Sequence, residues 1–318
     1  MTRPLGPPLN LTVLMYHYVR DDGDIAAGAS RIPGLSVPAF TAGLDELARH
    51  YTFVDWPAVR AHLLEQQPLP ENAALLTFDD GVCDHYLNVF PLLRQRGLSG
   101  LFFALARQPG EGHVLPIRLH FLLAALGPTG LRAAVWEGLN MGQQALYEDA
   151  EQRYERRWPG NAVNVLKGCL QRELCGQIDT LLGDLYATHV GDEAAEAARY
   201  YLSAEQVREM AAGGMHFGGH SRSHPWFDFI GREQRQAEIA ASAVWLSGVQ
   251  AGPWAFAYPY GGLHVEAPSQ LAAHGFAAAF TTKEHRTHTD RFYIGRYDGE
   301  DPLPLPAQAV TTPARTND

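Results

Sequence analysis

The sequence predicts an α/β protein built on a barrel of parallel strands, and three features of the chain carry this prediction. Short apolar runs alternate with stretches in which apolar residues recur every three or four positions, as in β-α units around a parallel sheet. The alternation stops at about residue 107 and resumes after residue 201, which predicts a helical insertion. Clusters of polar residues follow several of the apolar runs, where the active sites of α/β barrels lie.

Eight apolar runs have the length and composition of strands, and eight is the number of strands in a closed α/β barrel. They cover residues 11–15, 52–54, 74–78, 101–105, 215–218, 254–258, 277–281 and 292–295.

Helical periodicity fills the intervals between these strands. The predicted helices cover residues 39–50, 58–65, 85–96, 232–249 and 268–274, with 117–126 and 170–189 inside the insertion. Ser203 and Gln206 form a capping-box pattern, which predicts that a new helix begins directly after the insertion. We therefore expect a single domain over residues 1–318, with a helical insertion at 107–201 and a proline-rich tail at 301–318.

The composition argues against two classes of partner. The chain of 318 residues carries 25 Lys plus Arg against 35 Asp plus Glu, a net charge of -10 that opposes binding to nucleic acid. No apolar run approaches the ~18 residues of a membrane span. The 3 cysteines indicate no disulfide framework, and the first residues lack the pattern of a signal peptide. We expect a cytoplasmic protein.

Two adjacent carboxylates, Asp79 and Asp80, come directly after the third predicted strand. Adjacent side chains on a strand point to opposite faces, so the pair can share a task only if the strand has ended, and Gly81 permits such a turn. An ordinary solvated Asp-Asp-Gly turn is the alternative reading.

Two histidines four residues apart, His220 and His224, follow the fifth predicted strand. At this spacing both imidazoles can reach one ion, and one carboxylate of the Asp79–Asp80 pair would complete a set of three ligands. Three protein ligands and one open position are typical of a catalytic metal site, which predicts hydrolysis. Taken alone, the two histidines fit a pair of surface imidazoles equally well.

Four segments together resemble the polysaccharide deacetylase family, the NodB-like carbohydrate esterases. They are Leu14–Val19, Thr77–Gly81, His220–His224 and Phe256–Gly261, and the resemblance covers roughly residues 11–106 and 202–298. It implies a distorted α/β barrel of seven or eight strands and a metal-dependent removal of N-acetyl groups from sugars.

The resemblance also implies roles for individual residues. Asp80, His220 and His224 would bind a divalent metal, usually zinc, with Co2+ or Ni2+ as alternatives. Asp79 would be the catalytic base, and the backbone amide at Tyr260 would help to hold the oxyanion of the tetrahedral intermediate.

Two motifs of the family are absent in their usual form. A Leu-x-His motif normally supplies the general acid, and an arginine before the Pro-Tyr-Gly segment orients the base. His17, at the end of the first predicted strand, is the first candidate for the acid, with His285 and His288 as alternatives. Arg296 can replace the missing arginine or contact substrate, although a surface ion pair in Arg296-Tyr297-Asp298 is equally compatible with the sequence.

Aromatic residues gather near these motifs and suit the apolar faces of a sugar. Trp226, next to His224 in a loop, is the favoured substrate contact. Tyr258 is a further candidate, although core packing is the better explanation of Tyr258 and Phe227.

The sequence therefore predicts a zinc-dependent hydrolase that removes an N-acetyl or similar N-acyl group from a sugar. A cytoplasmic enzyme would meet a nucleotide sugar, a lipid-linked precursor or a small glycoside. Two other functions remain open: a sugar-binding protein with a weakened site, and a metal-independent amidase or cyclic-imide hydrolase of the same fold.

Overall fold

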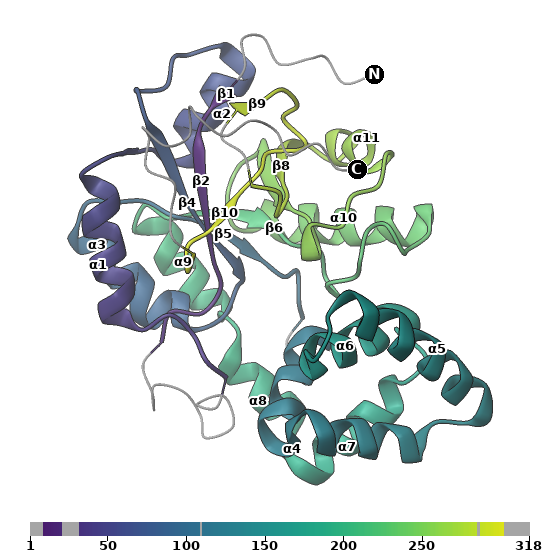
Figure 1. Ribbon diagram of the computed structural model, residues 1–318. Coiled ribbons are helices and arrows are strands. Elements are labelled where there is room, and N and C mark those ends of the chain that lie inside the picture. Colours follow the sequence, from purple (N-terminus) through teal and green to yellow (C-terminus); the bar gives the residue numbers. More distant parts are fainter. Residues whose placement is uncertain (1–8, 21–31, 109, 285–286, 302–318) are drawn as a thin grey trace. The chain divides into compact units, whose positions relative to one another are not determined.

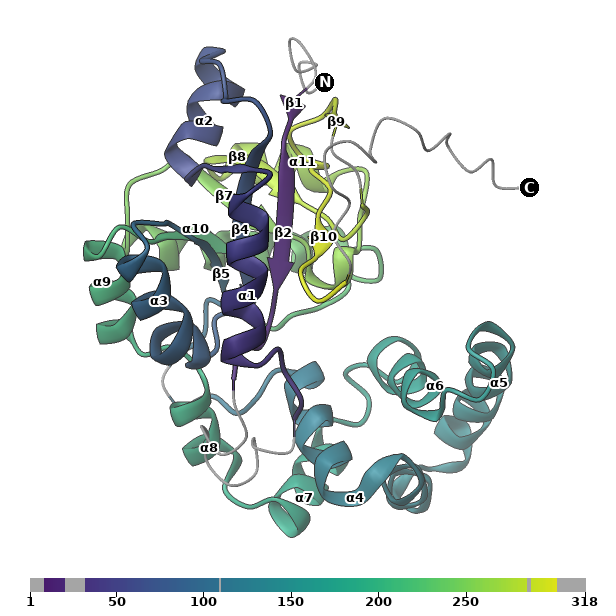
Figure 2. The same cartoon turned by 60° about the vertical axis from the view of Figure 1, so that its left-hand side comes forward.

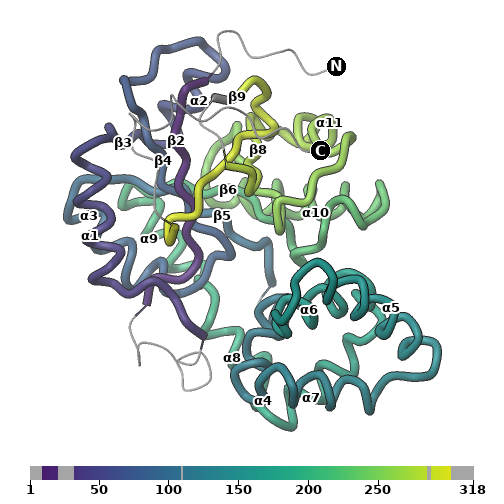
Figure 3. The backbone as a smooth tube through the Cα atoms, viewed as in Figure 1, coloured from purple at the N-terminus to yellow at the C-terminus, as the bar shows by residue number. Residues whose placement is uncertain are grey.

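The computed structural model describes residues 9–20, 32–108, 110–284 and 287–301, and its described residues divide into two compact units (Figures 1 and 3). The barrel unit comprises the described parts of 1–21, 34–106 and 202–318, and the helical unit comprises those of 22–33 and 107–201. The predicted tail lies outside the described residues from 302 onward, as does His285.

The barrel unit contains a curled sheet whose paired strands all run parallel. Its order is β10-β2-β4-β5-β6-β7-β8, and β3 pairs with β4 beside this path. The strands are β2 (Thr12–Tyr16), β3 (Thr52–Phe53), β4 (Ala73–Asp80), β5 (Leu101–Ala104), β6 (His216–Gly219), β7 (Trp254–Ala257), β8 (Phe276–Phe280) and β10 (Tyr297–Asp298). Because all are parallel, their carboxyl ends meet at one edge, and the predicted α/β barrel fold is confirmed.

The closing strand differs from the prediction. Residues 292–295 were expected to form the last strand, but they contribute only an isolated bridge between Ile294 and Phe280. A turn precedes this bridge, in which the amides of Phe292 and Tyr293 bond Asp290. Backbone hydrogen bonds join the buried run to β8, where the Ile294 amide donates to the Ala279 carbonyl and the Thr281 amide to the Ile294 carbonyl, but the strand that pairs with β2 is the later β10.

The strands of the sheet bury both of their faces. In β4, Ala73 and Leu75 belong to the apolar cluster that includes Leu101 and Phe103 of β5, whereas Leu76 and Phe78 pack in the cluster that contains residues of the surrounding helices. Such two-sided burial explains why these strands read as continuous apolar runs in the sequence.

Helices surround the sheet of the barrel unit (Figure 2). They are α1 (Val37–Ala48), α2 (Trp56–Glu65), α3 (Phe90–Gln95), α9 (Ala204–Ala212), α10 (Arg232–Ser247) and α11 (Ala267–Ala273), with a π-helical turn η2 (His85–Val89) leading into α3. The predicted capping box is present at α9, where Ser203 Oγ accepts from the Gln206 amide and the Gln206 side chain accepts from the Ser203 amide. A short antiparallel pair, β1 (Leu9–Asn10) and β9 (Thr287–His288), completes this unit.

The helical unit consists of α4 (Leu115–Gly138), α5 (Met141–Arg157), α6 (Ala162–Gly168), the π-helical turn η3 (Cys169–Glu173), α7 (Asp179–His189) and α8 (Glu193–Tyr200). α4 is kinked where Gly127 has a φ of 68° and Pro128 follows. The helix predicted at 170–189 is interrupted at 174–178, so only its second half forms α7. Among the described residues, no helix is both long and apolar enough to span a membrane.

Candidate metal centre

The two adjacent aspartates sit at the end of β4 and point to different partners. Positions 73, 75, 77 and 79 share one face of the strand, so Asp79 follows Thr77 on that face. Asp80 would point to the opposite face, but its φ of 74° places it in the left-handed region, and Gly81 follows with a φ of 64°. Both carboxylates thus lie at the same edge of the sheet, although β4 continues through Asp80 and does not end before the pair.

The register of the sheet brings His220 beside Asp80. Asp80 pairs with Ala104, Ala104 pairs with Gly219, and the His220 amide donates to the Ala104 carbonyl at 3.1 Å. The loop after β6 then turns back toward Asp80 and brings His224 to it. Ser221 and His224 both have positive φ values in this turn, of 67° and 56°. The Ser221 hydroxyl accepts from the His224 amide at 3.0 Å and stabilises this turn.

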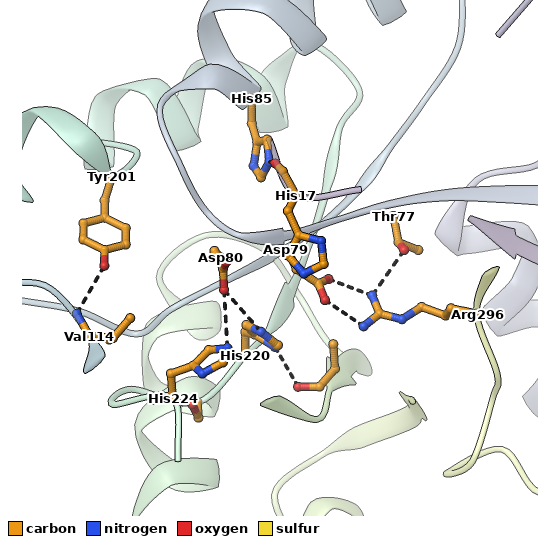
Figure 4. Close-up of polar contacts among 12 residues, drawn as sticks. His17, Thr77, Asp79, Asp80, His85, Val114, Tyr201, His220, His224 and Arg296 are labelled. Atoms are coloured by element: carbon orange, nitrogen blue, oxygen red, sulfur yellow. Dashed lines mark hydrogen bonds and ion pairs between the residues drawn. The ribbon is translucent and has the colours of Figure 1, made fainter. Parts of the chain in front are cut away.

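Asp80, His220 and His224 form a buried group whose possible ligand atoms all lie within 4.8 Å of one another. Asp80 Oδ1 is 3.5 Å from His220 Nε2 and 3.4 Å from His224 Nε2 (Figure 4). These three residues are between 2% and 7% exposed. Non-glycine residues with positive φ concentrate here, since Asp80, Ser221, His224 and Tyr260 all have one, which is typical of functional sites.

The polar atoms of this group fit a divalent cation. Asp80 Oδ1 is buried and has no hydrogen-bond partner among the described residues. His220 Nδ1 donates to the Ala257 carbonyl at 2.8 Å, which leaves the Nε2 lone pair directed toward Asp80. Two imidazole nitrogens and one carboxylate oxygen are a donor set that zinc prefers, and cobalt and nickel also accept it.

The charges of the site favour a cation at this point. Burial raises the pKa of Asp80, but the neighbouring His220 and His224 outweigh it and hold this pKa well below its usual range. Burial lowers the pKa of His220, but Asp79 and Asp80 outweigh it, so this pKa is raised. For His224, burial and the charge of His220 lower the pKa to about 4. The carboxylates thus stay ionised at neutral pH and attract positive charge.

Asp79 forms a bidentate ion pair with Arg296, with Nη1–Oδ1 and Nη2–Oδ2 distances of 2.7 Å each. The guanidinium is held from its other side, since Nε donates to the Thr281 carbonyl and Nη1 to the Thr77 hydroxyl, both at 3.3 Å. Burial raises the pKa of Asp79, but Arg296 and His220 outweigh it and keep it below its usual range. Arg296 is 1% exposed, so it is neither a surface ion pair nor an open substrate contact.

His17 is the one candidate acid that the described residues bring to the site. It directly follows β2, and its imidazole lies beside Asp79 in Figure 4. His288 lies elsewhere: it is buried in β9, with Nε2 donating to the Leu11 carbonyl at 3.0 Å and Nδ1 accepting from the Gly295 amide at 3.2 Å. This places His288 at the amino end of β2, away from the carboxyl edge of the sheet.

An aromatic wall borders His224. The Tyr260 ring meets His224 edge-on at 4.5 Å between centroids, and Trp226 stacks on Tyr260 at 4.3 Å and 6°. Phe229 continues the wall, 6.4 Å from Trp226 and 54% exposed. Tyr258 is 1% exposed and packs against Phe227 and Phe256, so it is a core residue and not a substrate contact.

Three residues that support the site were not singled out in the sequence. Glu238 of α10 accepts from the amides of Arg222 and Ser223 at 2.7 and 3.0 Å and from the Ser223 hydroxyl at 2.5 Å. Thr77 Oγ1 donates to the Leu14 carbonyl at 2.7 Å and contacts Arg296. His85 donates to the His17 carbonyl at 2.8 Å. Thr77 begins the segment Thr77–Gly81, but its contact with Arg296 appears only in the fold, and Glu238 and His85 belong to no local motif.

The helical unit contains a cavity of about 880 Å³ between α4, α5 and α6. Its lining includes the Arg132–Glu151 ion pair, with an Nε–Oε1 distance of 2.5 Å. No residue of the site described above lines this cavity.

Comparison with protein families finds the polysaccharide deacetylases. The family model described as "Polysaccharide deacetylase" matches residues 185–279, a stretch that includes both histidines and Tyr260 but not the aspartates. The chain is 28% identical over 109 residues to "Putative polysaccharide deacetylase YxkH" of Bacillus subtilis (strain 168). That alignment covers 34% of this chain and 36% of the relative, so the chain matches about a third of the length of this curated relative.

Solved structures share the fold over nearly the whole chain. IcaB from Ammonifex degensii aligns with a TM-score of 0.57 and 21% identity, covering 96% of this chain and 97% of that chain. The Streptococcus pyogenes deacetylase PplD in complex with acetate aligns with a TM-score of 0.55 and 16% identity, covering 92% of each chain. A de-N-acetylase from Aggregatibacter actinomycetemcomitans aligns with a TM-score of 0.53 and 15% identity, covering 92% and 97%.

Proposed function

We propose that this protein, whose resemblance to the polysaccharide deacetylases is confirmed by its family match and its fold, is a metal-dependent hydrolase that removes an N-acetyl group from a sugar. The observation that carries the proposal is the buried Asp80, His220 and His224 group with the Asp79–Arg296 ion pair beside it. Zinc is the first candidate for the metal, and cobalt and nickel are the alternatives.

Hydrolysis of an amide needs a stabilised carbonyl oxygen, an activated water and a protonated amine. A divalent cation held by Asp80, His220 and His224 would stabilise the carbonyl oxygen and lower the pKa of the attacking water. Asp79 is the residue placed to accept the proton of that water. Arg296 keeps this carboxylate ionised and holds both of its oxygens, so the base has one orientation.

The leaving nitrogen departs as an amine only if it gains a proton while the C–N bond breaks. We assign this proton to the His17 imidazole. His17 follows β2 at the same edge of the sheet as the metal group, and its imidazole lies beside Asp79. The backbone amide at Tyr260 would donate a hydrogen bond to the oxyanion of the tetrahedral intermediate. The products are acetate and a free amino sugar.

The aromatic wall supports a sugar as the substrate. The faces of Trp226 and Phe229 suit the C–H face of a pyranose ring, and Trp226 is fixed by its stacking on Tyr260. Among solved neighbours, the Streptococcus pyogenes protein is named a deacetylase and binds acetate, the product expected here. A small precursor, such as a nucleotide sugar, remains the predicted substrate.

The test compares the wild-type protein with Asp79→Asn and His220→Gln. Each protein is loaded with zinc, cobalt or nickel, its metal content is measured, and acetate release is followed from a nucleotide-linked N-acetylglucosamine and from a short N-acetylglucosamine oligomer. We expect Asp79→Asn to retain metal but lose at least about 100-fold in turnover, since a general base contributes about 10²–10⁴-fold. His220→Gln should lose the metal.

Two results would contradict the proposal. Binding of the sugar without acetate release by the loaded wild-type protein would identify a sugar-binding protein with a weakened site. Turnover that survives complete removal of metal by a chelator would identify a metal-independent hydrolase.

A further inference from the structure

The segment that carries His17 is held by side chains from a single helical turn. His17 to Arg20 follow β2, and η2 begins shortly after Asp80. His85 Nε2 donates to the His17 carbonyl at 2.8 Å, and Asn88 Nδ2 donates to the Val19 carbonyl at 2.8 Å. Asp84, which precedes η2, accepts from Arg20 Nε at 2.6 Å. The chain stretch that provides Asp79 and Asp80 therefore also anchors the segment of His17.

Of these contacts, the one made by His85 reaches the residue that we assign as the acid. The His85 side chain is 0% exposed. Its ring is fixed by two aromatic neighbours, Phe78 of β4 at 5.6 Å and Phe102 of β5 at 5.4 Å between centroids. The His85 donor is consequently tied to the same two strands that position the carboxylates.

His85 itself cannot act on the substrate, because its ring is buried and Nε2 is engaged with the backbone. Burial lowers the pKa of His85 to about 4, so the ring stays neutral at neutral pH. A neutral ring with its proton on Nε2 is a hydrogen-bond donor of fixed direction. Figure 4 shows the His85 ring next to His17, whose own imidazole extends toward Asp79.

We propose that His85 is a positioning residue for the general acid: through the His17 carbonyl it sets the backbone from which the His17 imidazole reaches the leaving nitrogen. The inference rests on the proposed function, because it matters only if His17 protonates a leaving amine. Small displacements of a catalytic group lower rates strongly, so removal of this one donor should be measurable.

The test uses two substrates that differ in their need for an acid. A short N-acetylglucosamine oligomer releases an amine that must be protonated, whereas 4-nitrophenyl acetate releases a phenolate that leaves without a proton. In the zinc-loaded full chain, His85→Phe keeps the ring volume but removes the donor, and His85→Gln restores a donor at a similar distance. We expect His85→Phe to lower kcat on the oligomer by about tenfold or more, a fraction of what general acids contribute, and to leave kcat on the ester within about twofold.

Two comparisons separate positioning from a general structural effect. His85→Gln should recover most of the loss on the oligomer. In a double-mutant cycle, His17→Ala combined with His85→Phe should be no slower on the oligomer than His17→Ala alone, because both changes remove the same contribution. Should His85→Phe not fold, His85→Asn takes its place, since its shorter amide cannot reach the His17 carbonyl.

The proposal is overturned by equal losses on both substrates, by full activity of the donor-free variant on the oligomer, or by additive effects in the cycle. If the loaded wild-type protein releases no acetate, the proposed function fails. The positioning role is then judged by the NMR signal of the His17 imidazole, which must shift in the donor-free variant and return in His85→Gln. An unchanged signal overturns the positioning role.

Discussion

At the scale of single residues, the different partners of Asp79 and Asp80 give these two neighbouring carboxylates different chemical properties. Asp79 faces a guanidinium that occupies both of its oxygens, and Asp80 faces two imidazoles. The first arrangement fixes the orientation of an ionised carboxylate, the base of the proposed mechanism, while the second leaves a buried oxygen that can bind a cation. Their order along the chain does not distinguish these roles, but their environments do.

Arg296→Met should shift the acidic limb of the pH profile of kcat/KM to higher pH. Arg296 lowers the pKa of Asp79, so its removal leaves burial unopposed and raises that pKa. Because the base acts in its ionised form, kcat/KM should fall at a higher pH than in the wild-type protein. Loss of one partner of a buried ion pair should also reduce the free energy of unfolding by about 3–5 kcal/mol.

The matched control for this prediction is Arg235→Met. Arg235 is equally buried, at 1% exposure, and pairs with Glu266 and Gln270 in the same unit. Its loss should destabilise the protein without moving the limb. If kcat/KM falls at the same pH in Arg296→Met and in the wild-type protein, Arg296 does not set the pKa of the base.

A second residue, His113 of the helical unit, should make stability depend on pH. It is 5% exposed and stacked on Phe121 at 4.7 Å, and burial lowers its pKa to about 3. Below pH ~6.5 the unfolded chain binds a proton that the folded state refuses, so stability is complete above this pH and declines as the pH falls. Between pH 7.5 and pH 5 this costs about 2 kcal/mol.

His113→Phe should remove this pH dependence. Chemical denaturation at pH 7.5 and pH 5 gives the free energy of unfolding of the variant and of the wild-type protein, and the difference between the two proteins should change with pH. Phe121→Leu alters the same cluster without a titrating group, so its effect should be equal at both pH values. A pH-independent difference for His113→Phe would show that His113 is not buried in its neutral form.

At the scale of elements, the loop after β6 depends on α10 for its shape. The loop contains two residues with positive φ, Ser221 and His224, and it places both histidines. Glu238 accepts hydrogen bonds from the amides of Arg222 and Ser223 and from the Ser223 hydroxyl. A strained loop persists only where its surroundings determine it, and here the Glu238 carboxylate supports the loop from α10.

Glu238→Gln should therefore weaken zinc binding. Replacing an outer partner of a metal site lowers affinity by about 10–100-fold, because the ligands lose their orientation. Competition with a chromophoric chelator measures the affinity directly, and kcat at saturating zinc should change little. Glu233→Gln, at an exposed position in the first turn of the same helix, should bind zinc like the wild-type protein. Equal affinity of all three proteins would contradict a supporting role of Glu238.

At the scale of the whole molecule, the site joins parts of the barrel unit that are distant in sequence. Asp80 ends β4, the histidines follow β6, and Arg296 comes just before β10. A cation held between β4 and the loop after β6 would join the two ends of a long chain segment, a site that only the folded state assembles.

Zinc should accordingly stabilise the fold. At a free concentration of about 100 times Kd, binding adds about 2.7 kcal/mol to the free energy of unfolding. Thermal unfolding with zinc and with a chelator measures this gain, and hydrogen exchange should show new protection at the end of β4 and at residues 220–224. His220→Gln should show neither effect. Equal stabilisation of this variant would mean that zinc binds elsewhere.

Local patterns determined much of the fold and of the candidate site. The apolar runs placed seven of the expected strands within a few residues, and the Ser203–Gln206 capping box marked the start of α9. The pairs Asp79–Asp80 and His220–His224 were recognisable in combination, because each follows the end of a predicted strand. These signals depend on neighbours one to four positions apart, which the sequence displays directly.

Only the tertiary structure decided which distant groups meet. The pairing of β10 with β2 replaced the strand expected at 292–295, and the tertiary fold brought Arg296 to Asp79 while holding His288 at the amino end of β2. It also buried Tyr258 and introduced Glu238 and His85 as supports of the site. These outcomes follow from sheet register and helix packing between remote segments, whose partners no local spacing encodes.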